Sequence, residues 1–114
     1  DGGAHVVDWQ TLGPGAGASD VAYLLGTSIA DAETRAQEEA RLVRFYVDQL
    51  RARGAAVDAD EVWREYRLYA FSGVLMAIIA STNVERTERG DEMFAVMTER
   101  PARQALHLNS LALL

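Results

Sequence analysis

Asp8 is the residue of this sequence best placed to do chemistry. It ends a short apolar run, Val6-Val7-Asp8, and is followed by Trp9 and Gln10. Runs rich in β-branched and aromatic residues are typical of strands, so the carboxylate is expected at a strand end. Magnesium prefers hard oxygen ligands, often one or two carboxylates together with phosphate groups. The pattern alone leaves two interpretations open, a metal ligand and an aspartate that forms a turn.

Other patterns that could carry chemistry are weaker. The loop over 13–18 has the G-x-G-x-x-A spacing of a dinucleotide-binding loop, and Glu38 lies about 20 residues further on. No second strand is predicted after the helix that follows, so the βαβ unit required by this fingerprint is missing. His5 and His107 lack the spacing of paired metal ligands.

The composition excludes several classes of protein. The 114 residues carry a formal net charge of −6 without a run of basic residues, which argues against nucleic acid as a partner. An acidic balance suits a cationic substrate but is also ordinary for a soluble protein. The absence of cysteine excludes a disulfide framework and fits a cytoplasmic protein. The most apolar stretch, 68–80, is too short to cross a bilayer, so no membrane contact is expected.

The segments around Asp8 resemble those of a known family. A hydrophobic pair, an aspartate and an aromatic residue at 6–9 are followed by a glycine-rich loop at 13–15 and by Ser-Asp-Val-Ala-Tyr-Leu-Leu at 19–25. This order resembles the end of the active site in aminoglycoside phosphotransferases and in the related choline- and ecdysteroid-kinase-like proteins. Further similar pieces lie at 44–46, 63–67 and 89–94, so the resemblance covers nearly the whole chain. Its first segment is the most specific.

The resemblance implies roles for individual residues. Asp8 matches the aspartate that binds Mg²⁺, and Val7 matches a position that packs against the adenine of ATP. Asp20 matches a carboxylate that braces the catalytic loop without touching substrate. Trp9 stands where the family often has an aromatic residue, for which core packing is the expected role.

The chain also departs from the family. The His-Gly-Asp motif with a following asparagine, which supplies the catalytic base and a metal ligand in these kinases, does not occur. The sequence contains no lysine, so the residue that clamps the nucleotide is absent as well. We therefore expect part of an ATP- and Mg-dependent phosphotransferase acting on a small-molecule hydroxyl, inactive alone. The alternative is a non-catalytic helical module for regulation or interaction.

The expected fold is mainly α. Residues 1–114 would form the helical C-terminal part of a protein-kinase-like C-lobe, with about five helices and one short strand over 5–9. Because a hairpin tip at 1–3 precedes this strand, a partner strand is expected upstream. The remaining partners would be the upstream part of the same protein and the small-molecule substrate. Apolar area facing the missing part would also allow a homo-oligomer.

Caps and periodicity set the expected helix boundaries. Helices are predicted over 21–28, 32–53, 59–81, 88–99 and 101–113. Ser19, Asp31 and Asp58 are the predicted N-caps, and Pro101 is expected to separate the last two helices.

Side-chain patterns predict which faces are buried. The apolar second half of the third helix is expected to be the central buried segment. In the second helix, the expected buried stripe consists of Ala36, Ala40, Val43, Val47 and Leu50. The pair Arg35–Glu39 is expected on the solvated face of that helix. Leu106, Leu111 and Leu114 are expected to anchor the C-terminal end.

Overall fold

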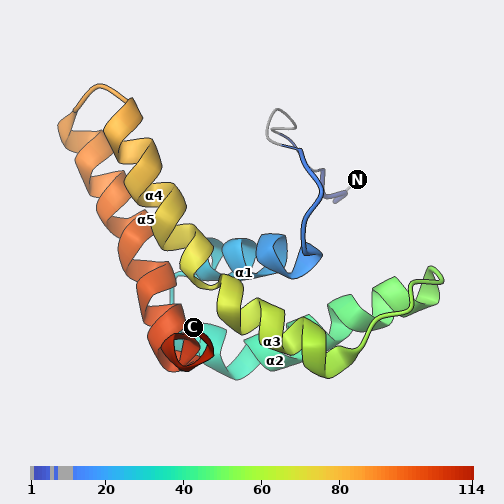
Figure 1. Cartoon of the computed structure of the whole chain (residues 1–114). Coiled ribbons are helices and arrows are strands. Elements are labelled where there is room, and N and C mark those ends of the chain that lie inside the picture. Colours follow the sequence, from blue (N-terminus) through green and yellow to red (C-terminus); the bar gives the residue numbers. More distant parts are fainter. Residues whose placement is uncertain (1, 6, 8–11) are drawn as a thin grey trace.

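The computed structural model describes residues 2–5, 7 and 12–114, and this part of the chain is mainly helical (Figure 1). The prediction of a mainly α fold is therefore confirmed. The elements are the α-helices α1 (Gly17–Ser28), α2 (Ala32–Ala52), α3 (Ala59–Tyr69), α4 (Phe71–Asn83) and α5 (Glu88–His107), and the 3₁₀ helix η2 (Ser110–Leu113).

The predicted strand over 5–9 is not found where the structure describes the chain. His5 and Val7 are in neither a strand nor a helix, while residues 6, 8 and 9 lie outside the described residues. No strand occurs elsewhere in the described ranges. A strand needs a neighbour to satisfy its backbone groups, and none is present among these residues.

Two of the three predicted N-caps are confirmed. The Asp31 carboxylate accepts a hydrogen bond from the Thr34 N–H at 2.7 Å, and Asp58 accepts from the N–H groups of Asp60 and Glu61, each at 2.9 Å. The prediction for Ser19 is wrong, because α1 already begins at Gly17 after Ala16. These caps satisfy donors that the first helical turn leaves unpaired.

The predicted helix over 59–81 is divided in two at Ala70. The Ala70 N–H bonds to the Arg67 carbonyl, a tighter spacing than the α-helical one, and the Ser72 hydroxyl donates to the Tyr69 carbonyl at 2.6 Å. A serine side chain that takes a helix carbonyl competes with the backbone ladder and favours a bend. α3 and α4 therefore follow each other in different directions (Figure 1).

Pro101 does not end a helix, contrary to the prediction. α5 continues through it to His107, and the proline ring is buried. Proline removes one helix hydrogen bond. Here the ring packs against Gly73 of α4, where a Cβ atom would lie only 2.6 Å from Pro101 Cγ. The close approach of α4 and α5 at this point favours the unbroken helix.

The core lies where α1, α2, α3 and the C-terminal half of α5 meet. Its largest member is Tyr66 of α3, which is fully buried and stacks on Trp63 with ring centroids 5.4 Å apart. The surrounding buried apolar residues are Ala18, Ala22, Leu25, Val43, Val47, Val62, Ala70, Ala105 and Leu108. The hairpin of α4 and α5 extends away from this core (Figure 1).

The prediction that the apolar second half of 59–81 is centrally buried is wrong. α4 turns Gly73 and Ala77 inward and leaves Leu75, Met76, Ile78 and Ile79 about half exposed. The small residues permit close packing on α5, while the larger apolar side chains keep about half of their surface open to solvent. Uniform apolar character therefore does not imply burial on all sides here.

The predicted anchors of the C-terminal end are also wrong. Leu106, Leu111 and Leu114 are exposed, whereas Leu108 and Ser110 are buried. Because α5 is unbroken, its helical register turns Ala105 and Leu108 towards the core instead. Asn109 then takes a left-handed conformation with φ of 50°, which redirects the chain into η2.

Candidate functional site

The residues predicted to bind ATP and Mg²⁺ come from the N-terminal segment. Val7 is 77% exposed, and Asp8 and Trp9 lie outside the described residues. Asp20 lies in the first turn of α1 and is exposed, so its carboxylate adds negative charge at a helix N-terminus, where that charge is favourable. Among the described residues, no group of three or more His, Cys, Asp or Glu side chains is arranged to hold a metal ion.

A polar cluster, here called the Glu39 cluster, joins α2, α3 and α5; its members are buried except His107, which is half exposed. It consists of Arg35, Glu39, Tyr66, Gln104 and His107. The Tyr66 hydroxyl donates to Glu39 Oε2 at 3.0 Å and accepts from Gln104 Nε2 at 2.8 Å. His107 Nε2 lies 3.2 Å from Glu39 Oε1. These contacts link residues that are far apart in the sequence.

The expectation that Arg35 and Glu39 form a solvated pair is wrong. Both side chains are 2% exposed, and Arg35 Nε lies 3.5 Å from Glu39 Oε2. Positions 35, 39, 43 and 47 are all buried, so the inward stripe of α2 follows a spacing of four residues throughout. The predicted stripe instead used 36 and 40, of which Ala40 is exposed.

Burial controls the ionisation of this cluster. Removal from water raises the pKa of Glu39, while the Tyr66 hydroxyl, Arg35 and His107 act in the opposite direction. Burial, together with the nearby charge of Glu39, raises the pKa of Tyr66 as well. Tyr66 therefore remains a protonated hydrogen-bond donor at neutral pH, which suits a structural role better than proton transfer.

Other aromatic and basic residues of α3 also hold the fold together. The Arg67 guanidinium donates through Nε to the Leu108 carbonyl at 2.9 Å and so fixes the end of α5 against α3. Tyr66 is buried and Tyr69 is partly buried. Tyr66 therefore packs in the core, and Arg67 makes a structural contact between α3 and the end of α5.

The sequence did contain a signal for the Glu39 cluster. Arg35 and Glu39 precede Val43 and Val47 at a spacing of four residues, which places all four on one helix face. A buried face that includes polar residues could therefore have been predicted. The contacts of Tyr66 and Gln104 with this cluster could not be predicted from the sequence, because they depend on the packing of α3 and α5 on α2.

No protein-family model matches the chain, and neither the curated proteins nor the solved structures contain a match. None of the helices in the described part of the chain combines the length and apolar character needed to cross a membrane.

Proposed function

We propose that this chain is the C-terminal helical part of an ATP- and Mg-dependent phosphotransferase that acts on a hydroxyl group of a small molecule. The observation that carries the proposal is the order of residues from Val6 to Asp20. An apolar pair, Asp8 and Trp9 precede a glycine-rich loop, and a helix with an acidic first turn follows. This order resembles that of the aminoglycoside-phosphotransferase family.

The donor chemistry of Asp8 fits Mg²⁺. A carboxylate is a hard oxygen ligand, and Mg²⁺ at phosphate-transfer sites takes one or two carboxylates together with phosphate oxygens. When bound, the ion would neutralise charge on the transferred phosphoryl group. Asp8 would hold the ion and Val7 would pack on the base. This chain alone contains no His-Gly-Asp sequence to activate the acceptor hydroxyl, so a catalytic base would have to come from elsewhere in the protein.

The exposed apolar surface of α4 is compatible with a role inside a larger domain. Leu75, Met76 and Ile79 expose much of their side chains, and they belong to the helix with the highest apolar content. In the proposed phosphotransferase, the upstream part of the same protein would cover this surface. The same surface also favours the alternative, a non-catalytic helical module that binds another protein.

The substitution Asp8→Asn tests the proposal. It is made in a protein in which a His-Gly-Asp loop precedes the residues of this chain. The amide keeps the shape of the carboxylate but removes its charge, so Mg²⁺ should bind poorly. We expect turnover to fall roughly a hundredfold or more, about 3 kcal/mol of transition-state stabilisation. The assay is Mg-dependent phosphate transfer to an acceptor, with thermal melts to verify folding.

Asp91→Asn is the matched control, since Asp91 is an exposed aspartate that forms an ion pair with Arg86. It should leave turnover unchanged. Near-normal turnover in Asp8→Asn would contradict the assignment of Asp8 as a ligand of Mg²⁺. A protein that lacks the His-Gly-Asp loop and transfers no phosphate would instead support the interaction module.

A further inference from the structure

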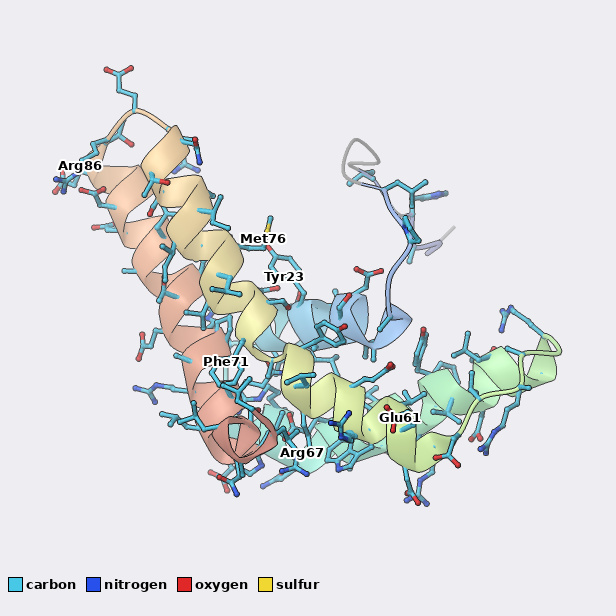
Figure 2. All side chains as sticks on the ribbon, viewed as in Figure 1. Tyr23, Glu61, Arg67, Phe71, Met76 and Arg86 are labelled. Atoms are coloured by element: carbon cyan, nitrogen blue, oxygen red, sulfur yellow. The ribbon has the colours of Figure 1, made fainter. Side chains whose placement is uncertain are left out.

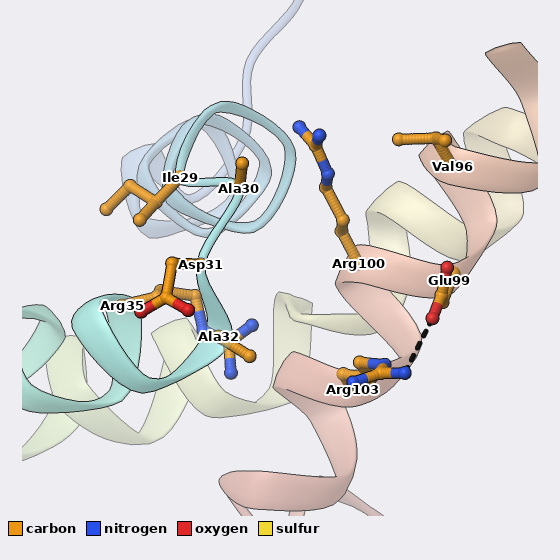
Figure 3. Close-up of a pocket in the computed structure, with 9 residues that line it drawn as sticks. All are labelled: Ile29, Ala30, Asp31, Ala32, Arg35, Val96, Glu99, Arg100 and Arg103. Atoms are coloured by element: carbon orange, nitrogen blue, oxygen red, sulfur yellow. Dashed lines mark ion pairs between the residues drawn. The ribbon is translucent and has the colours of Figure 1, made fainter.

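A pocket of about 330 Å³ lies between the turn that joins α1 to α2 and the middle of α5 (Figure 3). Its lining residues are Ile29, Ala30, Asp31, Ala32, Arg35, Val96, Glu99, Arg100 and Arg103. Three arginines from two helices therefore meet at one pocket, although the chain as a whole has a net charge of −6. Neither Val7 nor any of the residues from 12 to 20 lines it.

Arg35 is the buried cation of this pocket. Its side chain is 2% exposed, and its Nε has no hydrogen-bond partner. The nearest carboxylate oxygen, Glu39 Oε2, lies 3.5 Å from Nε and already accepts a hydrogen bond from Tyr66. A buried guanidinium with so few acceptors is poorly compensated. Because Nε itself is inaccessible, an anion in the pocket would act on this guanidinium mainly through its negative charge.

Arg100 and Arg103 line the pocket from α5. In Figure 3 the Arg100 side chain extends towards the turn at Ala30, and Arg103 points towards Glu99. Arg100 donates through Nη1 to the Thr27 carbonyl at 2.9 Å, which holds its guanidinium beside the end of α1. Within the described part of the chain, no carboxylate forms an ion pair with Arg100. Arg103 pairs with Glu99 at 2.7 Å and keeps other N–H donors free.

The two acidic residues of the pocket are already engaged. The Asp31 carboxylate accepts from the Thr34 N–H, and its hydrogen bonding to Thr34 lowers its pKa. Glu99 is paired with Arg103. Asp31 also caps α2, whose N-terminus contributes partial positive charge to the same wall. Among the described residues the charge of Arg100 therefore lacks a counter-ion, and Arg35 shares the carboxylate of Glu39 with Tyr66 and His107.

We propose that this pocket binds the phosphoryl group of a small anionic ligand. Guanidinium groups bind phosphate oxygens through paired, charge-assisted hydrogen bonds. Arginines on opposite walls suit a tetrahedral group, which presents oxygens in several directions, better than a planar carboxylate. Since one water molecule takes up about 30 Å³ of liquid, the volume is ample for such a group.

The first test is titration of the 114-residue chain with inorganic phosphate, at constant ionic strength and with chloride as the reference salt. Amide and arginine Nε signals in ¹H–¹⁵N spectra report where binding occurs. We expect saturable shifts at Ala30–Ala32, Arg35 and Arg100, with acetate binding more weakly than phosphate. Saturation elsewhere in the chain, absence of saturation, or tighter binding of acetate would overturn the proposal.

The second test compares variants. Arg35→Gln replaces a buried residue and is expected to lower the stability of the fold. Arg100→Gln is therefore the variant that tests binding. We expect Arg100→Gln to weaken phosphate binding roughly tenfold, because it removes a charged donor. Arg41→Gln is the control, as Arg41 is an ion-paired arginine of α2 outside the pocket. Equal phosphate affinity in Arg100→Gln and Arg41→Gln would contradict phosphate binding in this pocket.

Discussion

Tyr66 links three helices through one hydroxyl group. The hydroxyl donates to Glu39 and accepts from Gln104, whose Nε2 also reaches the Ala22 carbonyl at 3.3 Å. Buried polar groups contribute to a unique packing when their partners are present and are costly when a partner is lost. The cluster is not saturated, since Gln104 Oε1 has no partner in the structure. Tyr66 is thus a residue at which one atom affects α2, α3 and α5 together.

Removal of that hydroxyl should measurably destabilise the fold. Tyr66→Phe leaves the ring in place but deprives Glu39 of a donor and Gln104 of an acceptor. We expect the free energy of unfolding to fall by about 1–3 kcal/mol, measured by urea denaturation. Tyr69→Phe is the control, since the Tyr69 hydroxyl forms no hydrogen bond among the described residues; it should change stability by less than about 0.5 kcal/mol. Equal effects of both substitutions would contradict the assigned role of Tyr66.

Glu39 should give the fold a distinct pH dependence. Its pKa is raised in the folded chain above the ordinary value of 4.5, so folding favours the protonated form. The stability contributed by this raised pKa is fully present below pH 4.5 and is lost as the pH rises through the folded-state pKa. Glu39→Gln removes the titration, so the fall in melting temperature above pH 4.5 should become shallower.

Asp31→Asn is the control for this pH dependence. The pKa of Asp31 is lowered by its hydrogen bonding to Thr34, so its contribution is present above its usual value of 3.8 and is lost only at lower pH. The slope above pH 4.5 should therefore match that of the unmodified chain. An unchanged slope in Glu39→Gln would show that other groups dominate.

At the scale of helices, the features predicted correctly are those that depend on residues close together in the sequence. The caps Asp31 and Asp58 were correctly predicted because a cap involves only the next few residues. Pro101 was expected to end a helix, yet α5 passes through it because the ring packs against Gly73 of α4. The burial of Glu39 likewise depends on α3 and α5. Sequence patterns fix such tertiary contacts poorly, and the Val7–Asp8 assignment remains a prediction.

Gly73 should be the least replaceable glycine of the helical hairpin. A Cβ atom there would lie 2.6 Å from Pro101 Cγ and 2.8 Å from its Cβ, within a rigid ring. Alanine gains up to about 1 kcal/mol in helix propensity, but forced repacking typically costs about 1–3 kcal/mol. We expect a net loss of roughly 1–2 kcal/mol for Gly73→Ala in urea denaturation.

Gly15→Ala provides the comparison for that substitution. Gly15 lies in the loop before α1, and a Cβ atom at this position would meet no heavy atom within 4 Å, so the change should be within about 0.5 kcal/mol. A stabilised Gly73→Ala variant would show that α4 and α5 separate easily at this contact.

At the scale of the molecule, the core and the exposed apolar surface lie in different places. The core gathers around Tyr66, where α1, α2 and α3 meet the end of α5, while α4 carries its apolar residues along the projecting hairpin. Figure 2 shows Met76 of α4 and Tyr23 of α1 near each other, with Phe71 towards the base of the hairpin. Leu24 of α1 is exposed as well. Exposed apolar residues therefore occur on α1 as well as on α4.

This surface should make the 114-residue chain associate with itself when no other partner is present. Contiguous exposed apolar area is unfavourable in water and usually marks a contact surface. We expect light scattering to show an average mass that rises with protein concentration.

The double substitution Leu75→Gln with Ile79→Gln should shift the distribution towards the monomer, because both side chains lie on the outer face of α4. The control pair Leu106→Gln and Leu111→Gln changes equally exposed residues near the C-terminus and should leave the association intact. A monomeric unmodified chain at high concentration would contradict the expectation, and equal effects of both pairs would place the contact elsewhere.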